Sequence, residues 1–273
     1  MPTKANIPGS PKALVEVREL CKSFDGNQVL RGISVGFRER RTTVVLGPSG
    51  CGKSVLLKHL IGLLRPDSGE VLFDGERVDT IPEKHMTPLR RQFGFLFQMG
   101  ALFDSFDVRG NIEFPLREAG IEDPAERARR VEEVLAMVGL ESTITMMPAE
   151  LSGGQRKRIA LARSIVLRPR VILYDEPTTG LDPIRSDVIN ELILKLQQQL
   201  DATSIVVTHD LTSAFKVADH MILLLGGRVV MEGPPEAFRD PEDPEIRRFM
   251  EGRASEEELR AIRTSNPPIE VHT

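Results

Sequence analysis

The sequence predicts an α/β fold with a mostly parallel β-sheet that is covered by helices on both faces. Segments of strand-like character alternate with segments of helical periodicity, most regularly between residues 153 and 207. The strand segments are continuous runs of Val, Ile and Leu, which indicates that both of their faces are buried. With 40% hydrophobic and 28% charged residues, the chain of 273 residues can form a real core, which excludes a disordered or fibrous protein.

The individual elements follow from apolar patterning and from the turn residues that separate them. A helix is expected to begin near Lys53 and to end before Pro66, and Asp74-Gly75 is a typical hairpin turn. In chain order we expect strands at 14–17 and 42–46, a helix at 53–65, a hairpin at 69–78, helices at 124–138 and 153–167, a strand at 171–174, a helix at 184–200, strands at 204–207 and 221–225, and a charged helix-like segment at 244–263.

The segment between about residues 93 and 155 differs in character from the rest of the chain. Short apolar stretches are separated by turns there, and the helix expected at 124–138 is amphipathic. This pattern predicts a helical insertion within the α/β fold. Residues 1–12, rich in Pro, Gly and Ser, predict a flexible tail, and the last ten residues predict a disordered end.

Charge and cysteine content narrow the class of protein further. The formal net charge of -4 disfavours a generally basic nucleic-acid binder, so no nucleic-acid partner is expected. Two cysteines, Cys21 and Cys51, do not make a disulfide framework and favour a reducing compartment. The densest apolar run, Met221 to Leu225, is far shorter than the roughly 18 residues that cross a bilayer. We therefore expect any membrane role to come through a partner.

A phosphate-binding loop is the clearest chemical motif. The pattern GxxxxGK[ST] is matched in full by Gly47-Pro48-Ser49-Gly50-Cys51-Gly52-Lys53-Ser54. Glycines let the backbone N–H groups converge on phosphate oxygens, and the helix that begins near Lys53 directs its positive end at the anion. Lys53 can reach the β- and γ-phosphates, and the Ser54 hydroxyl can bind Mg²⁺. We interpret Cys51 as a space-filling residue, with a modifiable thiol as the alternative.

Two carboxylates end the strand expected at 171–174. Asp175 and Glu176 follow an apolar run directly, and ligands gather at the carboxyl ends of strands in open α/β sheets. Asp175 suits the magnesium-binding role of a Walker B aspartate. Glu176 suits a general base that polarises the attacking water. A solvated strand end is the alternative interpretation.

A second anion site is indicated by Leu151-Ser152-Gly153-Gly154-Gln155. Ser152 can cap the helix, and the two glycines expose N–H groups at its positive end. An ordinary capped helix is the alternative if SGG is considered alone. The full LSGGQ, twenty residues before the apolar strand, resembles the signature of ATP-binding-cassette (ABC) ATPases. The resemblance covers about residues 14–235.

The resemblance to ABC ATPases implies roles for four further residues. Phe24 corresponds to the aromatic residue that stacks on adenine, with a core phenylalanine as the alternative. Gln98, in FLFQ, corresponds to the Q-loop glutamine, which links Mg²⁺ and the attacking water to the permease-facing subdomain. Asp182 lies in a segment similar to the D-loop, which lies at the dimer seam. His209, in VVTHD, corresponds to the switch histidine that contacts the γ-phosphate.

The family also implies an architecture and an assembly. The fold would be a RecA-like P-loop NTPase core at about 13–92 and 156–235, with an antiparallel β subdomain and a helical subdomain inserted at about 93–155. Residues 236–273 would form a C-terminal extension with an interface helix. Two cassettes of this family pair head to tail, and each ATP, with Mg²⁺, lies between the phosphate loop of one copy and the LSGGQ motif of the other.

Segments beyond Gln98 are similar to one subgroup of the family. FQMGALFDS at 97–105, NIEFPL at 111–116 and GLDPI at 180–184 resemble the Mla/MCE-associated ATPases. This implies phospholipid transport between Gram-negative membranes with an MlaE-type permease, contacted near residues 98–116, and indirectly an MCE-domain protein. The chain would then be peripheral to the inner membrane, at its cytoplasmic face.

Two other functions remain open on sequence alone. One is a generic small-molecule importer cassette, and the other is a soluble ABC ATPase of the iron–sulfur cluster assembly type. In the C-terminal extension, Ile246, Phe249 and Met250 form a small apolar face at helical spacing. We hypothesise that the extension reaches the other cassette or the permease, and the alternative is a tail packed on its own domain.

Overall fold

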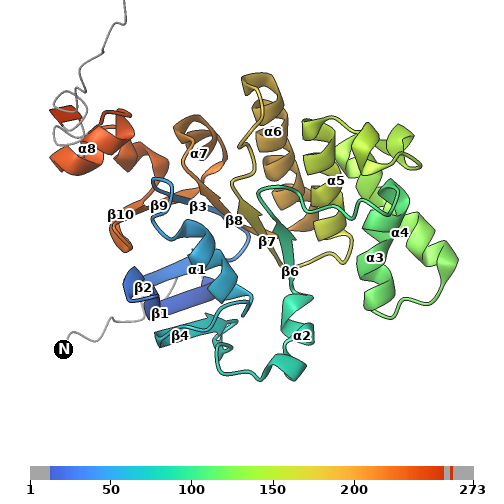
Figure 1. Ribbon diagram of the computed structural model, residues 1–273, viewed down its shortest axis with the longest axis horizontal. Coiled ribbons are helices and arrows are strands. Elements are labelled where there is room, and N and C mark those ends of the chain that lie inside the picture. The colour runs from blue at the N-terminus through green and yellow to red at the C-terminus, as the bar shows by residue number, and fades with distance from the viewer. Residues whose placement is uncertain (1–12, 255–258, 261–273) are drawn as a thin grey trace, which may run out of the picture.

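A computed structural model of the chain describes residues 13–254 and 259–260 (Figure 1). The flexible tail predicted at 1–12 and the disordered end predicted for the last ten residues lie outside the described residues. The described residues form two β-sheets with helices around them, and the helices α3 and α4 lie at the opposite end of the molecule from α8 (Figure 1). The predicted α/β class is confirmed.

The larger sheet has six strands in the order β10-β9-β3-β8-β7-β6. Its five strands from β9 to β6 are parallel, and only β10 is antiparallel to its neighbour β9. The bounds are β3 (Thr42–Leu46), β6 (Phe93–Leu96), β7 (Val171–Asp175), β8 (Thr203–Thr208), β9 (His220–Leu225) and β10 (Arg228–Gly233). The mostly parallel sheet is thus confirmed, and each strand predicted in it is present.

The smaller sheet is antiparallel, in the order β2-β1-β4-β5. Its strands are β1 (Ala13–Phe24), β2 (Asn27–Arg38), β4 (Ser68–Phe73) and β5 (Glu76–Arg77). The hairpin predicted at 69–78 corresponds to β4 and β5, with Asp74 and Gly75 both at positive φ in its turn. The long hairpin of β1 and β2 was not predicted beyond a strand at 14–17.

The helices alternate with the strands of the larger sheet. They are α1 (Lys53–Leu60), α2 (Thr87–Arg90), α3 (Val108–Glu118), α4 (Pro124–Val138), α5 (Gly153–Ile165), α6 (Pro183–Leu200), α7 (Leu211–Val217) and α8 (Pro244–Met250), with single 3-10 turns at Glu83–His85, Glu141–Thr143, Pro148–Glu150 and Pro235–Phe238. The helix predicted at 124–138 is confirmed to the residue. The helix predicted up to Pro66 ends at Leu60. In the segment predicted to be helix-like at 244–263, α8 spans Pro244–Met250, and residues 255–258 and 261–263 of that segment lie outside the described residues.

The helical segment of the fold contains α3 and α4, which pack on each other and on α5. The sequence placed the start of this segment at about residue 93. In the structure β6 occupies residues 93–96 and pairs with β7, so the larger sheet extends to Leu96 and the helical segment starts after it. The buried hydrophobic character of FGFL, which suits a sheet position beside β7, explains the difference.

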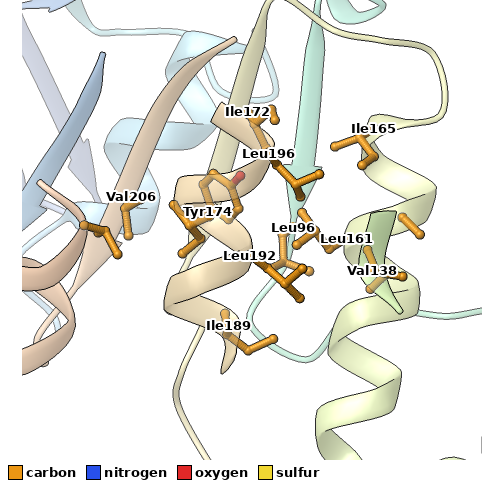
Figure 2. Close-up of a cluster of buried hydrophobic side chains, with 14 of the residues drawn as sticks. Leu96, Val138, Leu161, Ile165, Ile172, Tyr174, Ile189, Leu192, Leu196 and Val206 are labelled. Atoms are coloured by element: carbon orange, nitrogen blue, oxygen red, sulfur yellow. The ribbon is translucent and has the colours of Figure 1, made fainter. Parts of the chain in front are cut away.

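Two apolar clusters fill the two sides of the larger sheet, because successive residues of a strand point to opposite faces. On one side Ile172, Tyr174 and Val206 pack with α5, α6 and the helical segment. Figure 2 shows this cluster, with Tyr174 among the side chains of the surrounding elements. On the other side Leu173 and Val207 pack with α1 and the smaller sheet. Among the described residues, no helix combines the length and hydrophobicity needed to span a bilayer.

Candidate functional site

The loop at residues 47–52 connects β3 to α1 and curls tightly. Gly50 and Gly52 have φ of 80° and 104°, which side-chain-bearing residues rarely adopt. A side chain at Gly47 would collide with the carbonyl oxygen of Leu224 and with Sγ of Cys51. Gly52 lies against Val29 of β2 and is the N-cap of α1. The loop is therefore held between the two sheets with the helix start directly behind it.

Lys53 places a positive charge inside this loop. Its ammonium donates to the carbonyl oxygens of Gly47, at 2.8 Å, and Pro48, at 2.9 Å. The same nitrogen lies 3.3 Å from Oε1 of Glu176, and both side chains are buried. The two site segments predicted separately, the phosphate loop and the end of β7, thus meet at Lys53.

Ser54 and Asp175 provide oxygen ligands next to each other. The Ser54 hydroxyl donates to Oδ1 of Asp175 at 2.7 Å. Burial raises the pKa of the Asp175 carboxyl, and the hydrogen bond from Ser54 partly opposes that effect. A hydroxyl and a carboxylate are hard oxygen donors that suit Mg²⁺, which binds proteins through one or two carboxylates and takes its other ligands from substrate and water. Among the described residues, no group of three or more His, Cys, Asp or Glu side chains is placed to hold a metal ion.

Glu176 lies just past the end of β7 in a left-handed backbone conformation, with φ of 50°. Its N–H donates to the carbonyl of Val207 at 2.9 Å, which fixes the residue to β8. Its Oε2 lies 2.9 Å from Nδ1 of His209 and accepts weaker hydrogen bonds from the hydroxyls of Thr179, at 3.3 Å, and Thr208, at 3.4 Å. The carboxylate is therefore held from several sides and lies between Lys53 and His209.

These groups border one pocket of about 410 Å³. Its lining residues come from the phosphate loop, α1, β2 and three loops at the carboxyl ends of strands, and they are Val29, Ser49, Gly50, Gly52, Lys53, Ser54, Val55, Gln98, Glu176 and His209. The structure thus brings Gln98, Glu176 and His209 together with the phosphate loop, as the sequence indicated. Asp175 joins them through Ser54.

The LSGGQ segment lies outside this pocket. Ser152 caps α5, where its hydroxyl accepts from the N–H of Gln155 at 3.3 Å and its own N–H donates to the Gln155 side chain at 2.9 Å. Ser152, Gly154 and Gln155 border a different, small cavity together with Arg185. Asp182 caps α6 by accepting from the N–H of Arg185 at 3.0 Å. Within one chain, therefore, the second predicted anion site and Asp182 do not join the phosphate loop.

Phe24 also stands apart from the residues that line the pocket. It ends β1, is 39% exposed, and has the Lys22 ammonium 5.5 Å from its ring centroid. The core position that was its alternative does not apply. The strand that follows carries Val29, which lines the pocket, so the hairpin brings an exposed aromatic face to the same side of the fold.

An aromatic pocket lies beyond Gln98, in the segment that resembles the Mla/MCE subgroup. Phe103, Phe106 and Phe114 form a cluster with ring centroids 4.9 to 6.3 Å apart. Asn111 is fully buried and fixes this loop. Its side-chain amide nitrogen donates to the carbonyls of Phe103, Phe106 and Asp107, and its amide oxygen accepts from the N–H of Phe103. The neighbouring pocket of about 420 Å³ is lined by Ser105, Phe106, Asp107, Gly110, Phe114, Arg117 and Met147.

Sequence reasoning missed several residues that shape the site. Thr179 and Thr208 hydrogen-bond the Glu176 carboxylate, and Lys157 of α5 donates to backbone carbonyls in the loop after β7. A lysine on the same helical face as the apolar residues Leu161 and Ile165 was an available signal for Lys157. The threonines gave no such signal, because their partner depends on how the loops fold together.

Known proteins that are similar in sequence to this chain include transport ATP-binding proteins. Residues 30–179 match the ABC transporter family. The chain is 42% identical over 251 residues to the probable ribonucleotide transport ATP-binding protein mkl of Mycobacterium tuberculosis, covering 92% of this chain and 70% of the other. It is 37% identical over 241 residues to the intermembrane phospholipid transport system ATP-binding protein MlaF of Escherichia coli, covering 88% and 90%.

Solved structures of similar fold were also found. One is cbiO1 of Clostridium perfringens, part of the ABC transporter complex cbiONQ, with a TM-score of 0.76, 33% identity, and coverage of 82% of this chain and 89% of that one. Another is a dimeric ATP-binding cassette in a post-hydrolysis state bound to ADP and Pi, with a TM-score of 0.75, 32% identity, and coverage of 81% and 98%.

Proposed function

Because this chain belongs to the ABC transporter family and is an ATP-hydrolysing cassette of a transporter, we propose that two copies of it pair head to tail around two ATP molecules and power a separate membrane permease that moves phospholipid. The single observation that supports the hydrolytic part best is the convergence of Lys53, Ser54, Glu176 and His209 on one pocket.

Each residue of the pocket has a distinct task in hydrolysis. The Lys53 ammonium neutralises charge on the β- and γ-phosphates, in place of the carbonyls and carboxylate that surround it in the structure. Glu176 accepts the proton of the attacking water, and His209 orients that carboxylate and contacts the γ-phosphate. Ser54, Asp175 and Gln98 would hold Mg²⁺, which neutralises charge that develops on the phosphates.

The dimer follows from the position of the LSGGQ segment. The helix start at Ser152 supplies backbone N–H groups for an anion, yet the segment does not line the pocket of its own phosphate loop. A second copy in head-to-tail orientation would supply the missing contact to each ATP. The dimeric relative bound to ADP and Pi supports this arrangement.

The aromatic pocket beyond Gln98 suits the permease. A residue in this loop, Met99, is 89% exposed, and the Phe103, Phe106 and Phe114 cluster offers apolar surface next to a cavity. Both lie in the chain directly after Gln98, which lines the nucleotide pocket. A permease helix bound here would sense the nucleotide through that loop. The chain would then act at the cytoplasmic face of the inner membrane, peripheral through the permease.

Phospholipid is the proposed cargo because the similarity to the MlaF protein extends over nearly all of both chains. The similarity to a protein named for ribonucleotide transport keeps a small-molecule importer as the second candidate. The cassette itself contacts nucleotide and permease, so the partners decide between the two.

The C-terminal extension, residues 236–273, differs in part from the hypothesis made on its sequence. Ile246 is buried in the core cluster of its own chain, with Phe249 and Met250 packed against that cluster. The apolar face of α8 therefore packs on its own domain, which was the alternative interpretation. We still propose that the extension contributes to assembly, now through residues that follow α8.

Affinity purification of the tagged chain from detergent-solubilised membranes of its native cell tests the partners. An integral-membrane permease together with an MCE-domain protein supports lipid transport. A permease without an MCE-domain protein supports the importer, and recovery of soluble proteins without any permease would contradict the proposed transport role. Replacing Phe106 and Phe114 with serine should abolish recovery of the permease while ATP binding persists. A variant truncated after Ala254, which retains α8, measures the contribution of the rest of the extension.

A further inference from the structure

A buried lysine connects the helix that begins with the SGGQ motif to the loop that carries Glu176. Lys157 lies on α5 and is 8% exposed. Its ammonium donates to the carbonyl oxygens of Glu176, at 3.4 Å, Pro177, at 2.8 Å, and Thr179, at 2.6 Å. All three N–H donors of the ammonium therefore have a backbone acceptor in one four-residue stretch.

The loop bound by Lys157 has an unusual backbone. Glu176 has φ of 50° and Gly180 has φ of 78°, so both ends of the loop are left-handed. A glutamate keeps that conformation only where its surroundings hold it. Its N–H donates to the carbonyl of Val207, and its carbonyl accepts from the N–H of Thr179, at 3.3 Å, and from the Lys157 ammonium. Lys157 thus supplies one of three hydrogen bonds that anchor the backbone of Glu176, and the only one of them that comes from α5.

Burying the Lys157 charge costs free energy, and the need to fill space does not explain why a charged residue is present here. Burial lowers the pKa of the Lys157 ammonium to about 8, and the Glu176 carboxylate partly opposes this shift. A leucine or methionine would fill the same space among Ala160, Leu161 and the loop without burying a charge. Groups that cost stability are concentrated where a protein needs them for function.

Neighbouring cations of α5 bind elsewhere. Arg158 donates to the carbonyl of Val138, at the end of α4, and Arg163 donates to the carbonyl of Gly100, in the loop after Gln98. Those bonds tie α5 to the helical segment. Lys157 points from the same helix to the loop after β7, so it links the two parts of the site.

We infer that Lys157 is a positioning residue for ATP hydrolysis: its ammonium holds the backbone from Glu176 to Thr179 so that the Glu176 carboxylate stays beside Lys53 and His209. This inference rests on the proposed role of Glu176 as general base. Because α5 begins at the SGGQ motif, the same bonds make the position of Glu176 depend on that of the signature helix. Lys157 itself is not among the residues that line the pocket of the phosphate loop.

Steady-state hydrolysis of MgATP by the full chain carrying Lys157→Met tests the inference. We expect kcat to fall at least about ten-fold while KM for ATP stays within about two-fold, since small displacements of a catalytic group lower the rate without removing substrate contacts. Lys157→Arg, which retains N–H donors, should recover a large part of kcat. Lys195→Met is the matched control, because it also removes a lysine-to-carbonyl bond, to Met137, and should leave both constants unchanged.

The variant Glu176→Gln separates this inference from the proposed function. If Glu176→Gln hydrolyses ATP at the wild-type rate, the assignment of the base is wrong. If Glu176→Gln is inactive and Lys157→Met has wild-type kcat, only the inference about Lys157 is wrong. Adding Lys157→Met to Glu176→Gln should lower kcat by less than two-fold relative to Glu176→Gln alone, because both changes act through the same carboxylate.

A purely structural role would give a different pattern. Lys157→Met would then lower the melting temperature and change kcat and KM together. The kcat of the double variant would fall by the product of the two fold-changes seen in the single variants. Should Lys157→Met fail to fold, Lys157→Gln replaces it, and because it keeps two N–H donors we expect a smaller fall in kcat, of about two- to ten-fold, with KM unchanged. Failure of both variants to fold would make Lys157 a structural residue and overturn the inference.

Discussion

Nδ1 of His209 lies 2.9 Å from Oε2 of Glu176, although the two residues are 33 positions apart in the chain. They follow β7 and β8, which are neighbours in the parallel sheet. A parallel sheet places the ends of neighbouring strands at one edge, so two chemically different side chains meet there without any local sequence signal. The contact makes the histidine a direct orienting partner of the carboxylate that we propose as the general base.

Replacing Glu176 with glutamine should nearly stop hydrolysis and leave ATP binding intact. Loss of a general base lowers kcat by roughly 10² to 10⁴-fold, while Lys53 and the loop backbone still bind phosphate. Phosphate release and binding of a fluorescent ATP analogue measure the two properties. The exposed carboxylate Glu132, replaced in the same way, is the control. A hydrolysis rate equal to that of the wild type would disprove the assignment.

Asp175→Asn should weaken the dependence on magnesium selectively. The asparagine can still accept the hydrogen bond from Ser54, but it lacks the charge that attracts a divalent cation. We expect the Mg²⁺ concentration for half-maximal hydrolysis to rise at least about ten-fold. A magnesium titration at fixed ATP measures this, with the exposed Asp240→Asn as the control. An unchanged midpoint would remove Asp175 from the metal site.

Phe24→Ala should raise KM for ATP about three- to ten-fold, since aromatic stacking contributes roughly 0.5–1.5 kcal/mol. Phe24→Tyr should behave like the wild type, because a tyrosine presents the same ring face. The exposed Val230→Ala is a control for loss of surface apolar area. If Phe24→Ala binds ATP as tightly as the wild type does, the half-exposed ring does not contact adenine.

His59 should make the folded chain less stable in acid. The imidazole is buried in α1, with Nδ1 2.7 Å from the carbonyl of Val55 and Nε2 unpartnered among the described residues. Burial lowers the pKa of His59, and the nearby Lys22 lowers it further, while the hydrogen bond to Val55 and the Asp67 carboxylate oppose these effects. The unfolded chain therefore takes up this proton first as the pH falls below 6.5.

The stability that neutral His59 contributes is present above that pH and is lost below it. Chemical denaturation at pH 7.5 and 5.5 should show that the free energy of unfolding falls by about 1 kcal/mol more in the wild type than in His59→Leu over this interval. The comparison with the variant cancels the contributions of other titrating groups. Equal losses in the two proteins would contradict a depressed pKa.

Local signals predicted the elements with clear ends. The helix α4 begins after Asp123, whose carboxylate accepts from the N–H of Ala125, and stops at Gly139 in the left-handed conformation. The start of α5 at Ser152 is set by a reciprocal capping bond with Gln155. Such caps involve residues within four positions of each other, so the sequence contains the whole interaction.

Elements that depend on distant partners were predicted less well. The strand expected at 14–17 continues as β1 to Phe24, but its register shifts between Val17 and Leu20, and Glu19 has positive φ, which breaks the alternation that signals a strand. The helix α1 was expected to reach Pro66. It ends at Leu60, and Gly62, at φ of 64°, turns the chain earlier.

In the candidate site, too, residues with a local sequence motif were predicted and those that depend on distant contacts were not. Lys53, Ser54 and Glu176 were named because their chemistry requires those residue types in that pattern, and Gln98 was named from the resemblance to ABC ATPases. The neighbours that hold them were not, because a contact such as that of Lys157 with the loop after β7 depends on how α5 packs against the sheet. The position of LSGGQ outside the pocket of its own chain was implied only by the resemblance to ABC ATPases, in which the motif of one copy meets the phosphate loop of the other.

The most direct test of the account is the assembly state of the Glu176→Gln chain with MgATP, measured by analytical ultracentrifugation together with the number of nucleotides retained per chain. We expect a dimer that holds one ATP per chain and dissociates when ADP replaces ATP, and we expect a monomer when Ser152 is changed to arginine. A chain that stays monomeric with bound MgATP at every concentration, while the wild-type monomer hydrolyses ATP at full rate, would contradict it.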